Sequence, residues 1–283
     1  MPNHISNRIT IHAEPERVQK ILEAIKYDDY KIGSLDFNKI IPMPPELDVE
    51  SGSYSNRALE FYTQYIKQEN EPGIQVKLVK DYDADQQLID FGKQLYENKQ
   101  KHGHADWYGW CVANWDTKWN SYGYDENSPT YQGGNIIMFE TAWSSPEAII
   151  KRLSEMFPDV QFFHQWVDEA IGSNLGEVLY QNGDELEYDV PECYSKEAYE
   201  MYADFCDATL DEYGYYFDDK SSTYEYREDG DVEEVEPLIE KPPEKFSLRE
   251  SLALNAIKVR ESEQNQSQPT TKDMDDSKFR RLS

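Results

Sequence analysis

The fold of this 283-residue chain is organised around the stretch Trp107-Tyr-Gly-Trp-Cys-Val-Ala-Asn-Trp-Asp-Thr-Lys-Trp-Asn120. This stretch holds four of the six tryptophans. Trp107, Cys111, Trp115 and Trp119 recur every four residues, a spacing that places side chains along one face of a helix. A buried tryptophan contributes a large apolar area to a core. We therefore expect a helix that anchors the core, with an aromatic signature formed by Trp107, Trp110, Trp115, Trp119 and Trp143.

Polar side chains in the same stretch allow a second interpretation. Asn114, Thr117, Lys118 and Asn120 are the best candidates in the sequence for a small polar binding site. The competing interpretation is that they cap the helix and hydrogen-bond to the backbone around the packed tryptophans. The weight of four tryptophans in one segment favours this structural role, and the binding role stays open as an alternative.

The segments on both sides of the stretch alternate between strand and helix patterns. Strands are predicted at residues 6–12, 35–41, 135–143 and 159–168, and helices at 14–25 and 147–157. With an insertion between its halves, this is the β-α-β, β-α-β order of the ferredoxin-like, split βαβ fold. We expect an α+β protein with a four-stranded antiparallel sheet and two helices on one face.

Three further segments are predicted around this core. Residues 46–106 resemble an insertion, with helices at 56–68 and 84–101 and a strand or loop at 74–79. Asn182-Gly183 between alternating residues predicts a hairpin, and an acidic helix is expected at 195–213. The expected domains are a ferredoxin-like domain at 1–176 with its helical insertion at 46–106, an acidic hairpin and helix extension at 177–217, and an acidic linker with a largely disordered tail at 218–283. In that tail, residues 247–259 have the spacing of a short amphipathic helix.

Negative charge is concentrated in one part of the chain. The formal net charge is −28, of which −21 lies in residues 151–240, whereas residues 241–283 carry +2. Such a field repels phosphate, so we expect no direct binding of nucleic acid. It suits a basic partner, or a surface that competes with nucleic acid for that partner. A solvated surface that only maintains solubility is the alternative.

Several short motifs taken together resemble the YubB-like or Api92-like ferredoxin-fold family of phages and plasmids. The motifs are Met1-Pro-Asn3 with Ser6-Asn7-Arg8, Asp36-Phe-Asn-Lys-Ile-Ile-Pro-Met-Pro44, Trp110 with Asn114-Trp115-x-Thr-Lys-Trp119-Asn120, and Thr141-Ala-Trp143-Ser144 with Pro146. They cover residues 1 to about 170. The resemblance implies residence on a mobile genetic element and no settled activity, because a fold does not define a function.

The chain departs from the family pattern at two places. His4 and Ile5 stand where the family usually has Trp-Cys, and Asp116 stands where a glycine is usual. A glycine there suggests a turn with positive φ, which aspartate adopts less easily. This departure puts any site at Asp116 in question.

Motifs for catalysis, metals and cofactors are weak or missing. His102, His104 and Asp106 lack a further zinc ligand at a defined spacing, and Cys111 among aromatics is ordinarily a small buried hydrophobe. Three cysteines without a CxxC pair exclude the usual iron–sulfur site. We expect a non-enzymatic protein with no catalytic residues, no metal and no cofactor. Without an apolar run of about 18 residues or a signal peptide, we expect no membrane association and a host bacterial cytoplasmic location.

Acidic and aromatic residues alternate in the segment that carries most of the charge. The expected partner-binding residues are Asp204, Asp207, Asp211, Glu212, Tyr215, Tyr216, Asp218, Asp219, Glu228, Asp229, Asp231, Glu233 and Glu234. Charge runs are usually solvated linkers or tails, but aromatics are sparse in ordinary linkers, so a binding surface and a solvated acidic tail both stay open. The predicted function is binding and inhibition of a host protein with a basic surface, such as a nuclease or DNA-binding complex, in an anti-defence role through DNA mimicry. The alternatives are a small-ligand or nucleotide-binding protein or enzyme that uses Asn114 and Lys118, and a structural homo-oligomer.

Overall fold

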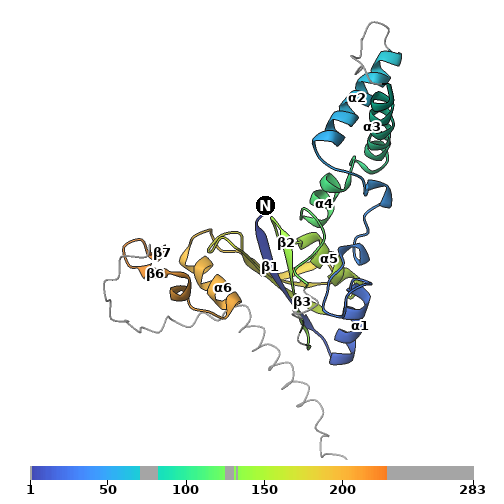
Figure 1. Cartoon of the computed structure of the whole chain (residues 1–283). Coiled ribbons are helices and arrows are strands. Elements are labelled where there is room, and N and C mark those ends of the chain that lie inside the picture. Colours follow the sequence, from blue (N-terminus) through green and yellow to red (C-terminus); the bar gives the residue numbers. More distant parts are fainter. Residues whose placement is uncertain (1, 71–81, 125–130, 132, 228–283) are drawn as a thin grey trace, which may run out of the picture. The chain divides into compact units, whose positions relative to one another are not determined.

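A computed structural model describes residues 2–70, 82–124, 131 and 133–227 (Figure 1). The contacts divide the chain into two units, Met1–Asp231 and Val232–Ser283, and every described residue lies in the first. The expected strand or loop at 74–79, the amphipathic segment 247–259 and the expected disordered tail lie outside the described residues.

A five-stranded antiparallel sheet forms the centre of this first unit. Its strands lie in the order β2-β1-β3-β4-β5. Their bounds are β1 His4–His12, β2 Ile136–Ala142, β3 Gln161–Asp168, β4 Gly176–Gln181 and β5 Asp184–Asp189. The central strand β1 pairs on both sides, with Ile9 opposite Ile137 on β2 and His164 on β3. Buried and partly exposed residues alternate along β1, because successive side chains in a strand point to opposite faces.

Two amphipathic helices cover one face of the sheet, as the ferredoxin-like order predicts. Helix α1 (Pro15–Ile25) begins with a proline at its first position, which suits a residue without an N–H, and buries Val18, Ile21, Leu22 and Ile25. Helix α5 (Glu147–Met156) buries Ile149, Ile150 and Leu153. These side chains share one hydrophobic core with the inward-facing residues of β1, β2 and β3. The predicted ferredoxin-like α+β class is therefore confirmed.

The strand expected at residues 35–41 is wrong. This segment forms a 3₁₀ turn, η1 (Phe37–Lys39), because side chains rather than a neighbouring strand satisfy its backbone. Asp36 accepts from the Asn38 N–H at 2.9 Å, and Asn120 accepts from the Phe37 N–H at 2.9 Å. A second 3₁₀ turn, η2 (Pro45–Leu47), follows in a proline-rich stretch. The edge of β2 is instead met by Tyr122, through a single bridge to Glu140.

The insertion contains two long helices, α2 (Ser53–Asn70) and α3 (Tyr82–His102). Figure 1 shows them lying against each other. They bury their own small core around Ala58, Leu88 and Leu95. Gly92 permits this close approach, since a Cβ there would lie 2.2 Å from the Ala58 carbonyl oxygen.

The acidic extension is folded through residue 227, ten residues past the boundary that we expected at 217. After the β4–β5 hairpin come α6 (Lys196–Cys206), η3 (Leu210–Tyr213), β6 (Tyr215–Asp218) and β7 (Thr223–Tyr226). The acidic helix expected at 195–213 is divided, because Asp207 takes a left-handed conformation (φ 52°) and ends α6. The hairpin β6–β7 falls partly in the expected linker, and its aromatic contacts with α6 explain why this segment is ordered.

The face of the sheet opposite α1 and α5 is contacted by α6. Its residues Ala198, Tyr202 and Phe205 share a second hydrophobic cluster with Val167 of β3 and with Leu175. The Arg8 guanidinium of β1 lies 4.4 Å from the Phe205 ring centroid and donates to the Phe205 carbonyl. This contact attaches the first part of the extension to the central strand of the sheet.

Candidate functional site

The tryptophan stretch forms a helix that is shorter than its spacing predicts. Helix α4 (Trp107–Trp115) buries Trp110, Cys111 and Trp115, and the chain turns at Asp116, so Trp119 lies beyond the helix. The Trp115 ring N–H donates to the Ile41 carbonyl at 2.9 Å, and the Trp110 and Trp115 rings meet edge to face at 5.4 Å. The core role therefore rests on Trp110 and Trp115, whereas Trp143 is 41% exposed.

The polar residues of this stretch bind to their own chain. Asn114 donates to the Trp110 carbonyl at 2.8 Å, and the buried Thr117 hydroxyl donates to the Trp119 carbonyl at 2.8 Å. The Asn120 oxygen accepts from two backbone N–H groups, and its nitrogen donates to Asp36 at 2.8 Å. These three side chains hold three different segments of backbone, and their hydrogen bonds do not converge on one cavity.

Lys118 occupies a place of its own between two exposed or half-buried indoles. Its ammonium group lies 4.6 Å from the Trp119 ring centroid and 4.8 Å from the Trp143 ring centroid. A cation between two aromatic faces is stabilised by both ring quadrupoles. The Lys118 ammonium group therefore contacts the two indoles, and Asn114, Thr117 and Asn120 take no part in this contact.

Asp116 adopts the positive φ that the glycine of the family pattern suggests, at 62°. Its carboxylate accepts from the Ala148 N–H at 2.8 Å, in the first turn of α5. Its carbonyl accepts from the Ser144 hydroxyl. A carboxylate at a helix N-terminus satisfies a free N–H and is favoured by the helix dipole. Asp116 thus links the end of α4 to the start of α5, a contact that glycine has no side chain to make.

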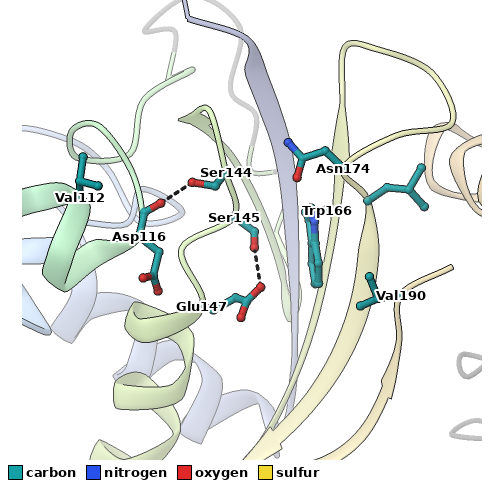
Figure 2. Close-up of a pocket in the computed structure, with 9 residues that line it drawn as sticks. Val112, Asp116, Ser144, Ser145, Glu147, Trp166, Asn174 and Val190 are labelled. Atoms are coloured by element: carbon teal, nitrogen blue, oxygen red, sulfur yellow. Dashed lines mark hydrogen bonds between the residues drawn. The ribbon is translucent and has the colours of Figure 1, made fainter. Parts of the chain in front are cut away.

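A cavity of about 460 Å³ lies beside this link (Figure 2). Its lining comes from α4 and its cap, the β2–α5 loop, α5, β3 and the residues that flank β4 and β5. The lining residues are Val112, Asp116, Ser144, Ser145, Glu147, Trp166, Asn174, Leu175 and Val190. Gly176 makes room for the Trp166 indole, because a Cβ at this position would lie 2.7 Å from the ring. The cavity is thus bounded by an indole and aliphatic groups on one side and by carboxylates on the other.

The electrostatics of the cavity are set by Asp116 and Glu147. Partial burial raises the pKa of the Glu147 carboxyl above its usual range, and the negative charges of Asp116 and Glu185 raise it further. The Glu147 carboxylate is 3.5 Å from the Ser145 hydroxyl, and no Lys or Arg of the described residues forms an ion pair with it. Chemically, the cavity offers hydrogen-bond acceptors and negative charge.

A second cavity, of about 440 Å³, lies between the sheet and α6 and includes His4, Glu140 and Cys206 among its lining residues. The His4 Nδ1 atom is 2.7 Å from the Tyr122 hydroxyl and 3.6 Å from the Glu140 carboxylate. Burial raises the pKa of Tyr122 to about 12, and Glu140 adds to this shift. His4, which departs from the family pattern, therefore joins β1 to the segment that crosses the edge of β2.

The predicted partner-binding residues fall into two groups. Asp204, Asp207, Asp211, Glu212 and Asp219 are exposed, and Asp218 is half-buried. Glu212 also accepts from the Thr209 N–H at 3.2 Å, and Asp218 accepts from the Ser221 N–H at 2.9 Å. Tyr215 contacts Tyr199 and Tyr226, and Tyr216 lies under Arg227 at 4.5 Å. The described acidic residues thus lie on elements that pack together through tyrosine side chains. The remaining predicted residues, Glu228, Asp229, Asp231, Glu233 and Glu234, lie outside the described part of the chain.

The weak metal and nucleophile candidates have local structural roles. Asp106 caps α4 by accepting from the Tyr108 N–H at 3.1 Å, and the described residues contain no group of three side chains suited to a metal ion. Burial raises the pKa of Cys111 to about 12, so its thiol is protonated at neutral pH. Within the same part of the chain, no helix has the length and apolar character needed to cross a bilayer.

Sequence patterns alone missed the main components of the first cavity. Glu147 reads as an ordinary acid in the first turn of a helix, and Trp166 as one residue of a buried strand. Asn174 lies in a loop with positive φ, 47°, and donates to Asp168 at 2.7 Å. Only the pairing of β3 with β4, which sets Trp166 opposite Gly176, brings these residues together.

Comparison with known proteins bears on the family. Residues 114–209 match the family model described as a ferredoxin-like domain in Api92-like protein. A crystal structure of a protein Api92 from Yersinia pseudotuberculosis is similar at 11% identity and a TM-score of 0.34, with 68% of this chain and 99% of that chain covered. No curated protein matches.

The matched range bears on the acidic extension as well. It ends at residue 209, so it includes β4, β5 and α6, which the motifs quoted from the sequence do not reach. It also contains most of the residues that line the first cavity. Residues 114–209 are therefore similar to the ferredoxin-like domain of Api92-like proteins.

Proposed function

We propose that this chain is a binding protein of a phage or plasmid that inhibits a host protein with a basic surface, such as a nuclease or another DNA-processing protein. The contact is made by residues 184–227, the part of the acidic extension from β5 to the end of the described residues. One observation carries the proposal: these residues hold fourteen Asp and Glu against three Lys and Arg, and eleven of the fourteen acids lie in β5, α6, η3, β6 or β7. A fixed array of carboxylates matches a basic surface better than a solvated tail, because less ordering entropy is lost on binding.

The basic residues of the extension leave this negative field largely uncompensated. Lys196 is 3.6 Å from Glu200 and lies over the Phe217 ring, and Arg227 lies over Tyr216. Asp204, Asp211 and Asp219 are exposed, and their side chains form no ion pair with the described residues. Exposed aromatics next to such charges supply the apolar contact that protein interfaces need in addition to charge. Competition with DNA for the same partner follows from this arrangement.

The test is affinity purification from a bacterial lysate with matched variants. The test variant carries Asp204→Asn, Asp211→Asn and Asp219→Asn, and the control carries Asp29→Asn, Asp48→Asn and Glu50→Gln, three exposed acids elsewhere on the domain. We expect nucleic-acid-binding proteins with the wild type and the control and a large loss with the test variant, and we expect duplex DNA to displace the captured protein. Capture that is insensitive to the test substitutions would refute the proposal.

A further inference from the structure

Strand β5 forms one edge of the five-stranded sheet and exposes an unusual set of side chains. It pairs with β4 on one side, and on its other side no backbone hydrogen bond to the described residues is formed. Leu186 and Tyr188 of β5 and Val190, which directly follows β5, are 47%, 73% and 53% exposed. An open edge with exposed apolar residues is a template for pairing with another strand.

The two faces of this edge differ in chemistry. Tyr188 is paired with Val178, and Val190 packs against Gly176, so both lie on the face that α5 covers. Glu187 and Asp189 pair with Leu179 and Glu177 and therefore lie on the opposite face. An extended segment that complements β5 alternates apolar residues, placed beside Tyr188 and Val190, with basic residues placed beside Glu187 and Asp189.

The charges on β5 distinguish between two occupants of this edge, a second copy of this chain and a strand from a different protein. A second copy of this chain would place acidic residues beside acidic residues, and like charges on neighbouring strands are destabilising. The register shift between Leu179 and Tyr180 also bends the strand near Leu186, which shortens the straight edge to about residues 187–190. A short acidic edge of this kind favours a basic strand from a different protein over self-association.

We propose that β5 accepts an extended segment of its protein partner, with alternating apolar and basic residues, as a sixth strand of the sheet. The proposal rests on the proposed function, since it names how the basic partner is held. Main-chain hydrogen bonds to residues 187–190 provide part of the affinity, and the alternating side chains provide the specificity. The exposed carboxylates of α6 and η3 then contact other parts of the same partner.

The test uses the full-length chain and three synthetic six-residue peptides. The first alternates lysine with valine, the second is the same peptide methylated on every backbone nitrogen, and the third alternates glutamate with valine. We expect the first to bind and to slow hydrogen exchange of the amides around residues 186–190. We expect the methylated peptide, which keeps its charges but lacks the donors, to bind at least about tenfold more weakly. The glutamate peptide is expected not to bind.

Variants of the protein supply the matched controls. The pair Glu187→Lys and Asp189→Lys should reverse the preference in favour of the glutamate peptide, whereas the pair Asp29→Lys and Asp48→Lys, at exposed acids outside the acidic extension, should leave it unchanged. Equal binding of the methylated and unmethylated peptides would overturn strand addition while leaving the acidic partner surface intact. Absence of binding by every peptide would also overturn strand addition, and the lysate purification then decides the proposed function separately.

Discussion

Replacement of Asp116 by glycine and by alanine separates the cost of its left-handed backbone from the contribution of its hydrogen bond to α5. Aspartate at φ 62° is strained, and a left-handed conformation costs a residue with a Cβ about 1 kcal/mol. Its carboxylate caps α5 through the Ala148 N–H at 2.8 Å, a contact worth about 1 kcal/mol. Glycine removes both contributions, so Asp116→Gly should change the free energy of unfolding by less than about 0.5 kcal/mol.

Alanine at the same position loses the cap but keeps the strain. Asp116→Ala should therefore lower the free energy of unfolding by about 1–2 kcal/mol, and it should be less stable than Asp116→Gly by about 1 kcal/mol. Asp116→Asn, which keeps an acceptor and tolerates positive φ, should lie close to the wild type. Urea unfolding followed by tryptophan fluorescence measures all three, because Trp110 and Trp115 are buried nearby.

Two results would refute this reasoning. Equal stability of the glycine and alanine variants would show that the left-handed conformation at residue 116 carries no cost. A glycine variant more stable than the wild type by over about 1 kcal/mol would show that the contact with Ala148 contributes nothing.

Three further predictions follow from single side chains. Gly176→Ala should destabilise the fold by about 1–3 kcal/mol, because its Cβ would meet Trp166 at 2.7 Å and Val190 at 2.9 Å. Thermal unfolding measures this change, and the control is Gly109→Ala in α4, where the Cβ would lie 3.3 Å from His104 Nδ1 and alanine favours the helix, so its effect should be smaller. Trp115→Phe should lower the free energy of unfolding in urea by about 2–4 kcal/mol, since the Ile41 carbonyl loses its donor. The control is Trp143→Phe at an exposed indole, and an effect of Trp115→Phe as small as that of the control would contradict the core role of Trp115. Burial lowers the pKa of His164 to about 3, so between pH 3 and 6.5 the unfolded chain binds more protons than the folded chain. The contribution of the neutral His164 to the free energy of unfolding should be complete above pH 6.5 and fall as the pH decreases towards 3. A His164→Gln variant with the same pH dependence as the wild type would exclude this source.

The negative charge and the predicted fold class came from local patterns. Proline and acids at the start of α1, the period of its apolar residues, and the Asn182-Gly183 turn each specify structure within a few residues. Charge is a property of composition, so its concentration in residues 151–240 required no coordinates. The family motifs likewise pointed to the family that the match over residues 114–209 supports.

The sequence by itself determined the class of fold, the two helices on one face, the hairpin and the acidic character of the extension, because these depend on neighbours along the chain. The tertiary structure alone decided the end of α4 at Asp116, the loss of a strand at residues 35–41 and the open edge of β5. In the first two cases the deciding partner is distant in sequence: Ala148 for Asp116 and Asn120 for Phe37. The open edge of β5 follows from the strand order, in which β5 pairs among the described residues with β4 alone. Periodicity cannot reveal such partners, since it records which side of an element is apolar and not what lies against it.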